Sequence, residues 1–178
     1  TVTATVGVGR FGVSYKARDS KLNQDVLLKF IHPSYLPGKK HRSRFIEGMW
    51  AIRQNGYPMH ASVFDVDRYG EAIFVSTEFL GGIPLQELLD NRELAGRQFS
   101  IHEILPILRQ LSAFLVESGI GVHGALCPRN VWIHPGNLRV TDCGLVQNLP
   151  PDAVAYKLSQ SERDRRFVAP EILSGRDY

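Results

Sequence analysis

The chain has 178 residues, 43% of them hydrophobic and 22% charged, an ordinary globular composition with enough apolar residues for one sizeable core. Its formal net charge is +3 and no run of five like charges occurs, so we expect no nucleic acid partner. No stretch of about 18 consecutive apolar residues is present, and we therefore expect neither a membrane span in this segment nor a signal peptide.

Residues 1–80 read mainly as strands. A helix fits residues 42–55, because Phe45, Met49 and Ile52 recur on one helical face. Alternating or β-branched runs predict the strands, at residues 1–6, 12–17, 24–31, 62–66 and 72–79, with the last two forming an antiparallel hairpin.

After Gly81 and Gly82 the pattern becomes helical. Ser100 and Glu103 form a capping-box pattern at the start of an apolar helical repeat over residues 101–116. Pro106 lies inside this repeat, so the helix either kinks there or begins near it. Residues 131–133 and 138–141 flank the turn sequence HPGN and predict a second small hairpin. This order predicts two lobes, residues 1–80 and 81–178, with a cleft between them where ligands commonly bind.

The two cysteines, Cys127 and Cys143, belong to no C-x-x-C pair and no zinc-ligand set. They favour a reducing setting. We therefore expect a cytoplasmic location, or that the chain is the intracellular part of a larger protein.

A glycine string, G-x-G-x-x-G-x-V, lies between the first two predicted strands and contains Gly7, Gly9, Gly12 and Val13. Such glycines let backbone N–H groups approach a phosphate closely. A dinucleotide fingerprint would open a helix instead, so the strand-loop-strand context disfavours it. Lys29 follows on the third predicted strand, where an amine in an apolar run needs an anionic partner or an exit to solvent.

Three further motifs follow in order: TEFL before Gly81, HGALCPRN at residues 123–130, and TDCG at residues 141–144, with VAPE downstream. Together these ordered motifs resemble the protein kinase superfamily, particularly the bacterial Ser/Thr branch, from end to end. The resemblance implies an α+β bilobal fold, with an antiparallel sheet and one helix in the N-lobe and a mostly helical C-lobe truncated after the A-P-E motif.

The resemblance also implies roles for individual residues. Gly7, Gly9 and Gly12 would cover the phosphates of ATP and Lys29 would reach them. Thr77 falls at the gatekeeper position, and the backbone of Glu78 and Leu80 would face adenine. Asn130 and Asp142 match the two magnesium ligands, so the cofactors it implies are ATP and Mg²⁺.

Several positions depart from the kinase pattern. Ala125 replaces the catalytic Asp, whose carboxylate orients the substrate hydroxyl and accepts its proton. Gly124 replaces the Arg that binds a phosphorylated activation segment, and Cys127 replaces a lysine near the transferred phosphate. Gly48 falls at the helix glutamate that pairs with the strand lysine, and Glu47 is one residue, about 100°, away around the helix.

These departures predict a pseudokinase in signalling that acts through a protein partner or by allosteric regulation, with ATP bound weakly if at all. Two alternatives stay open: a divergent active Ser/Thr kinase that recruits another base, and a scaffold whose nucleotide slot is filled by Leu27 and Trp132, both larger than the family's usual residues. Cys143, at the Phe of D-F-G, is expected in the core. The chain ends at Tyr178, so either helices that follow in kinases lie downstream, or uncovered C-lobe faces bind a partner or a second copy.

Overall fold

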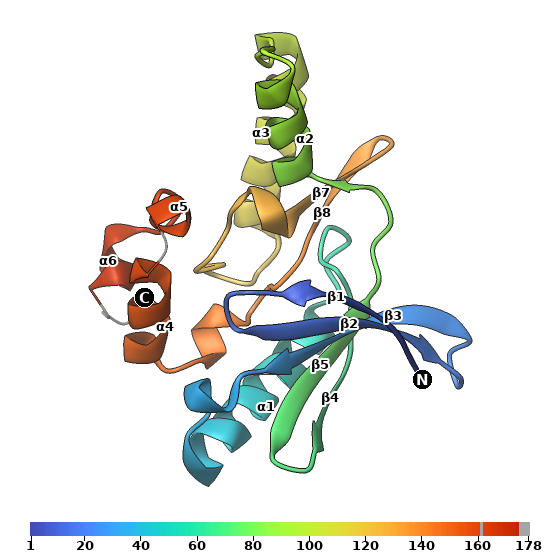
Figure 1. Ribbon diagram of the computed structural model, residues 1–178, viewed down its shortest axis with the longest axis vertical. Helices are drawn as coiled ribbons and strands as arrows, with labels where there is room; N and C mark the ends of the chain where they lie inside the picture. The colour runs from blue at the N-terminus through green and yellow to red at the C-terminus, as the bar shows by residue number, and fades with distance from the viewer. Residues whose placement is uncertain (161, 175–178) are drawn as a thin grey trace.

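The computed structural model describes residues 1–160 and 162–174; the predicted C-lobe range extends to Tyr178, and its last four residues lie outside this described part. Figure 1 shows two lobes, with the N-terminal sheet in one and α2 and α3 in the other. The N-lobe contains β1 (Val2–Val8), β2 (Gly12–Asp19), β3 (Gln24–Ile31), the short helix η1 (Pro33–Tyr35), α1 (Gly38–Asn55), β4 (Val63–Tyr69) and β5 (Ala72–Glu78).

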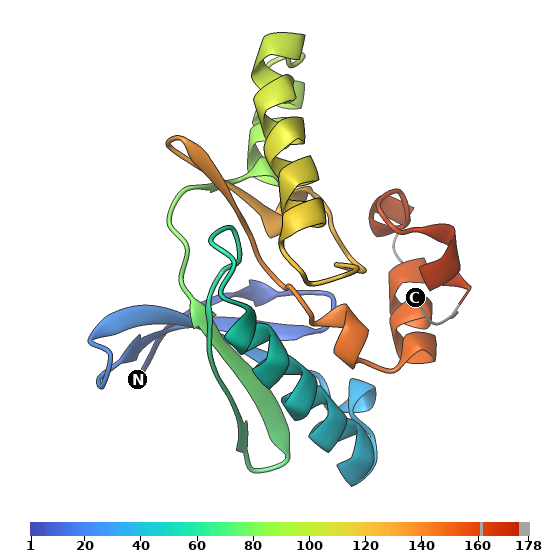
Figure 2. The same cartoon turned by 180° about the vertical axis from the view of Figure 1, so that it is seen from behind.

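The N-lobe strands form one antiparallel sheet in the order β1-β2-β3-β5-β4, with α1 packed against it (Figure 2). Phe45 and Met49 of α1 are fully buried, as the spacing of apolar residues predicts. The helix ends at Gly56, whose φ of 58° lies in the left-handed region that glycine adopts without strain. Each predicted strand is present, with ends that differ by a few residues.

The C-lobe combines a small sheet with helices. Its elements are β6 (Ile83–Pro84), α2 (Leu85–Leu94), α3 (Ile101–Glu117), η2 (Pro128–Asn130), β7 (Val131–His134), β8 (Asn137–Val140), η3 (Val146–Asn148), α4 (Pro151–Ser159), α5 (Glu162–Arg165) and α6 (Pro170–Leu173). The second predicted hairpin is β7–β8, to which β6 adds a third strand. The α+β bilobal fold expected from the resemblance is confirmed.

Helix α3 begins at the capping box rather than at Pro106. The Ser100 side chain accepts from the Glu103 N–H, and the Glu103 carboxylate accepts from the Ser100 N–H. Pro106 therefore lies inside the helix, and Phe114, fully buried, anchors its later turns against β8. Ile101, Leu108 and other apolar side chains of α3 are exposed. None of the described helices combines the length and the apolar character needed to span a membrane.

His60 sits where the two lobes meet. It follows α1, forms a bridge with Val140 of β8, and is 5% exposed. Its ring lies 5.5 Å from the Phe114 ring, and within the described residues its Nε2 has no hydrogen-bond partner. Burial first, and then electrostatic interaction with His123 and Arg139, lower the pKa of His60 to about 4. The imidazole is therefore neutral at pH 7.

The fold should lose stability in mild acid because of His60. The His60 imidazole takes up a proton near pH 6.5 in the unfolded chain but only near pH 4 in the folded chain. The contribution of neutral His60 to the free energy of unfolding is therefore complete above pH 6.5 and is lost as the pH falls toward 4. The loss is on the order of 3 kcal/mol. Urea unfolding between pH 7.5 and 4 should show this slope, and His60→Phe should flatten it. The remaining slope would come from His123, whose pKa burial also lowers, and at the acidic end from Glu103, whose pKa is lowered to about 2 by hydrogen bonds from Ser100 and by Arg92. An equal slope in wild type and variant would contradict the assignment.

Candidate functional site

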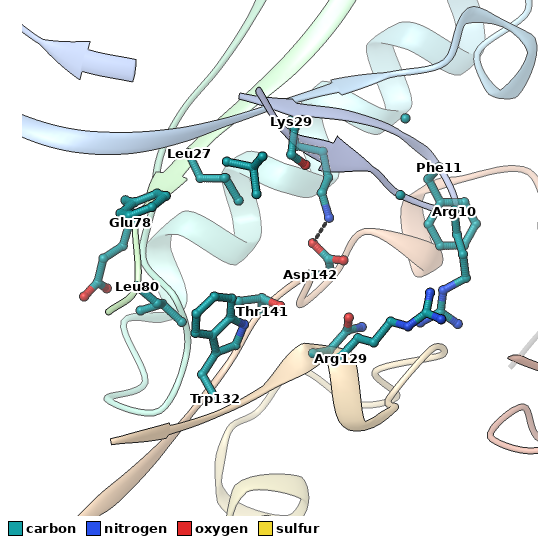
Figure 3. Close-up of a pocket in the computed structure, with 16 residues that line it drawn as sticks. Arg10, Phe11, Leu27, Lys29, Glu78, Leu80, Arg129, Trp132, Thr141 and Asp142 are labelled. Atoms are coloured by element: carbon teal, nitrogen blue, oxygen red, sulfur yellow. Dashed lines mark hydrogen bonds and ion pairs between the residues drawn. The ribbon is translucent and has the colours of Figure 1, made fainter. Parts of the chain in front are cut away.

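A pocket with a cavity volume of about 240 Å³ lies between the lobes (Figure 3). Its volume is slightly below the usual range of about 300–1,000 Å³ for small-molecule sites. The walls come from the glycine string, β3, the segment after β5, η2, β7 and the segment after β8. The pocket therefore lies where the sequence predicts a nucleotide.

Most of the predicted site residues meet in this pocket. Those that line it are Gly9, Gly12, Lys29, Glu78, Leu80, Asn130 and Asp142. Gly7 pairs with Ser14 within the β1–β2 ladder, and Val13 lines a neighbouring groove beside α4. Thr77 lines a smaller cavity behind Lys29. Two arginines that line the pocket, Arg10 and Arg129, are not predicted from the sequence.

The glycine string folds as a tight turn against the N-lobe. The Gly9 N–H donates to the Gly12 carbonyl at 2.8 Å, which closes the turn. A Cβ on Gly12 would collide with the Phe30 carbonyl of β3, so a side chain has no room there. Phe11, at the tip, is buried and packs edge-on against the Tyr35 ring with centroids 5.6 Å apart. This ring contact packs the turn against η1 of the N-lobe.

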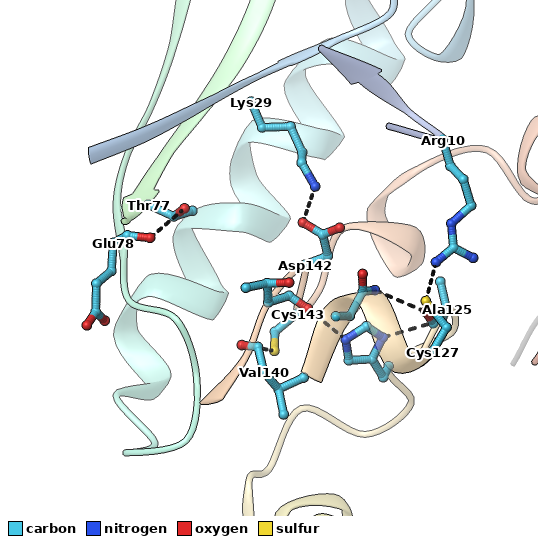
Figure 4. Close-up of polar contacts among 12 residues, drawn as sticks. Arg10, Lys29, Thr77, Glu78, Ala125, Cys127, Val140, Asp142 and Cys143 are labelled. Atoms are coloured by element: carbon cyan, nitrogen blue, oxygen red, sulfur yellow. Dashed lines mark hydrogen bonds and ion pairs between the residues drawn. The ribbon is translucent and has the colours of Figure 1, made fainter. Parts of the chain in front are cut away.

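Lys29 and Asp142 form an ion pair across the pocket (Figure 4). Burial alone raises the pKa of the Asp142 carboxyl, but the Lys29 ammonium and other nearby charges outweigh burial and hold that pKa below its usual value. Asp142 has a positive φ of 63°, a conformation that non-glycine residues seldom adopt. Lys29 thus finds the anionic partner that its strand position requires, and this partner comes from the C-lobe.

Helix α1 supplies no carboxylate to Lys29. A Cβ on Gly48 would collide with the Asn148 side chain of η3, whose Nδ2 donates to the Gly144 carbonyl at 2.7 Å. Glu47 points to solvent, as its position around the helix predicts. The space of the expected glutamate is therefore filled by the segment that follows Asp142.

This packing gives a prediction for a double-mutant cycle. Alanine is favoured over glycine inside a helix by about 1 kcal/mol, so Gly48→Ala should stabilise the domain by about that amount once Asn148→Ala has removed the obstructing side chain. In the wild-type background the same change should be neutral or destabilising, because it displaces Asn148. Urea unfolding of the four proteins measures the coupling. Equal effects of Gly48→Ala in both backgrounds would show that the two residues do not compete for space.

The loop at residues 123–130 keeps its shape without the catalytic Asp. The buried His123 contacts the Thr141 carbonyl through Nε2 at 2.9 Å and accepts the Ala125 N–H through Nδ1 at 3.4 Å. Burial lowers the pKa of His123, although the bond to Thr141 opposes this, so the neutral ring with its proton on Nε2 satisfies both contacts. Asn130 Nδ2 donates to the Ala125 carbonyl at 3.1 Å. Ala125 is 2% exposed and places a methyl group where the carboxylate is expected.

Asn130 and Asp142 are suited to Mg²⁺. The Asn130 amide nitrogen is used by the Ala125 carbonyl, which leaves its Oδ1 for the pocket, and the Asp142 carboxylate lines the same pocket. One or two carboxylate or amide oxygens, completed by substrate phosphates and water, are a usual magnesium ligand set. Among the described residues no group of three or more His, Cys, Asp and Glu side chains forms another metal site. A Mg²⁺ ion held there would offset the negative charge of bound phosphate groups.

Leu27 and Trp132 both line the cavity, at the end where the resemblance places adenine (Figure 3). That these two side chains fill the adenine slot stays a prediction. Next to them the Glu78 carboxylate is bound by Arg139, with Nη1 to Oε1 at 3.1 Å, and Arg139 also donates to the His60 carbonyl at 2.7 Å. Trp132 and Leu27 thus form part of the cavity wall next to this ion pair.

Trimming the indole should improve nucleotide binding. Trp132→Leu removes part of one wall of a small cavity, so ATP affinity should rise by roughly tenfold. Trp50→Leu is the matched control, since Trp50 lies on α1 beside Arg53 and away from the pocket. Calorimetric titration with ATP measures both. Unchanged affinity in Trp132→Leu would show that the indole does not limit access.

Cys143 lies in the second core cluster with Phe114, Ile120 and Val140. Its Sγ lies 3.6 Å from the Val140 carbonyl, and burial raises the pKa of the thiol (Figure 4). It is thus a protonated core residue, as expected from the sequence.

The comparisons with known proteins agree with this geometry. The family model described as protein tyrosine and serine/threonine kinase matches residues 1–178. The chain belongs to this kinase family. A probable serine/threonine-protein kinase of Clostridium perfringens is 24% identical over 96% of the chain, and the serine/threonine-protein kinase pkn3 of Myxococcus xanthus is 28% identical over 82% of it. The mitogen-activated protein kinase hog1 of Blastobotrys adeninivorans is 32% identical over 94% of it.

This kinase-family chain spans only part of its relatives. It covers 24% of the Clostridium protein, 27% of the Myxococcus protein and 40% of hog1. Among solved structures, the PknI kinase domain of Mycobacterium tuberculosis matches all of the chain with a TM-score of 0.76 and 19% identity, and the chain covers 66% of it. At this identity the structural match shows the kinase fold alone.

Proposed function

We propose that this kinase-fold domain is a pseudokinase, which binds ATP weakly and acts by contacting a protein partner or by allosteric control. The observation that carries the proposal is Ala125, a buried methyl group at the position of the catalytic Asp. A methyl group can neither orient a substrate hydroxyl nor accept its proton. Phosphoryl transfer by this site would need another base.

Of the described residues that line the pocket, two carry a carboxylate, and neither is free to replace the missing Asp. Asp142 is paired with Lys29, and Glu78 is paired with Arg139 at the opposite end of the pocket. His123 is buried, and both of its ring nitrogens contact the backbone. The proposal is therefore supported by the surroundings of Ala125 as well as by the substitution itself.

A divergent active Ser/Thr protein kinase is the second candidate. Gly9, Gly12, Lys29, Asn130 and Asp142 line the pocket, and the bacterial relatives are named serine/threonine-protein kinases. Because positioning and charge stabilisation supply most of the catalysis of phosphoryl transfer, these residues favour a residual rate. This candidate predicts thermal stabilisation by ATP that requires Mg²⁺.

A protein partner, or a second copy of the chain, belongs to the same proposal. Helix α3 exposes Ile101, Leu108, Leu115 and Val116, with Val116 83% exposed. An apolar surface of this kind supports an interaction between proteins. Co-sedimentation or crosslinking of the domain, with and without Leu108→Glu and Leu115→Glu, tests self-association through this helix.

A phosphotransfer assay separates the two candidates. With radiolabelled ATP, Mg²⁺ and a generic protein substrate, we expect no transfer above the level of the Asp142→Ala variant, because both proteins lack a base at residue 125. The assay should include the chain itself as a substrate. Transfer that requires Mg²⁺ and disappears in Asp142→Ala would overturn the pseudokinase proposal in favour of an active kinase.

A further inference from the structure

Arg10, within the glycine string, lines the cleft between the lobes and is only partly exposed. Its Nη2 donates to the Cys127 Sγ at 2.7 Å (Figure 4), and its Nη1 is buried without a hydrogen-bond partner in the described part of the chain. No carboxylate among the described residues pairs with it. A guanidinium group has five N–H donors, and leaving a buried one unsatisfied is costly. Arg10 therefore has unused capacity for an anion.

Arg129, from η2, lines the same pocket and also forms no ion pair within residues 1–160 and 162–174. Figure 3 shows the side chains of Arg10 and Arg129 together at the end of the pocket away from Glu78 and Leu80. The end opposite the predicted adenine slot thus carries two guanidinium groups.

The charges that line the pocket are unbalanced. Lys29 is paired with Asp142, and Glu78 is paired with Arg139, so both carboxylates of the lining are already neutralised. Among the described residues Arg10 and Arg129 form no ion pair with either carboxylate, although Arg10 lies close enough to Asp142 to help lower the pKa of that carboxyl. Arg10 is partly exposed and Arg129 is exposed. Two cations that lie together at one end of a pocket favour a bound anion, because that anion removes their mutual repulsion.

We propose that Arg10 and Arg129 bind the terminal phosphate groups of a nucleoside triphosphate directly, so that the nucleotide is retained without a divalent cation. The proposal rests on the proposed binding of ATP in this pocket. The planar fork of a guanidinium group matches two phosphate oxygens at once. Arg10 reaches Cys127, the position where the kinase pattern has a lysine, so the glycine string supplies the cation that the loop at residues 123–130 lacks.

Binding with and without metal tests this site. Calorimetric titration with ATP and AMP, in EDTA and in excess Mg²⁺, should give ATP dissociation constants that agree within about threefold between the two buffers. In EDTA, Arg10→Ala and Arg129→Ala should each weaken ATP binding roughly tenfold. AMP binding should be unchanged, since AMP lacks the terminal phosphates. Arg68→Ala, an exposed arginine on β4, is the matched control.

The controls distinguish loss of the phosphate contacts from unfolding of a variant. AMP binding reports an intact adenine slot in each variant, and Arg10→Lys, which keeps the charge but loses the fork, should fall between wild type and Arg10→Ala. ATP binding only in Mg²⁺, or binding in EDTA that neither Arg10→Ala nor Arg129→Ala weakens, would overturn the site. Absence of nucleotide binding in both buffers would overturn it together with the proposed ATP binding. Phosphotransfer by wild type would overturn the pseudokinase proposal while leaving this site standing.

Discussion

The ion pair between Lys29 and Asp142 is the constraint around which the site is arranged. It joins the third strand of the N-lobe to the segment after β8, and it uses the amine and the carboxylate that a nucleotide and a metal would otherwise engage. Gly48 stands at the position of the helix glutamate that pairs with this lysine in kinases. It packs directly against Asn148, so no side chain can extend from it toward Lys29. The Lys29 ammonium is thus paired with a C-lobe carboxylate, and the segment after Asp142 fills the space next to α1.

The loop at residues 123–130 keeps its shape without a carboxylate at residue 125. His123, Asn130 and backbone groups of Ala125 and Thr141 hold the loop through neutral hydrogen bonds. None of these bonds needs the missing Asp side chain. The shape of the loop therefore does not depend on a carboxylate at residue 125, and the pocket beside the loop is kept.

Much of the fold and of the site follows from the sequence. Alternating apolar runs predict all the long strands. The capping box of Ser100 and Glu103 predicts the start of α3 correctly, because its hydrogen bonds fix the helix start even though Pro106 follows inside the helix. Helix α2 has no buried residue and lacks an apolar stripe that would predict it. Arg10 and Arg129 are missed because an arginine in a loop is usually solvated, and only the tertiary structure turns them into the cleft. Trp132 lines the cavity, as its place in the kinase pattern predicts.

The clamp between Glu78 and Arg139 has a mechanical consequence. Arg139 contacts both the Glu78 carboxylate and the His60 carbonyl, so it fastens the connection between the lobes at two points close to the adenine slot. Rotation of one lobe relative to the other would have to break the bidentate, partly buried ion pair between Arg139 and Glu78. The glycine turn, by contrast, meets the C-lobe through Arg10 and Cys127, while its other contacts, such as the Phe11 ring on Tyr35 and the Phe11 carbonyl with the His32 N–H at 2.9 Å, stay within the N-lobe. A ligand that drew Arg10 away from Cys127 would therefore loosen the lobes at the glycine turn while the clamp at Arg139 stayed closed.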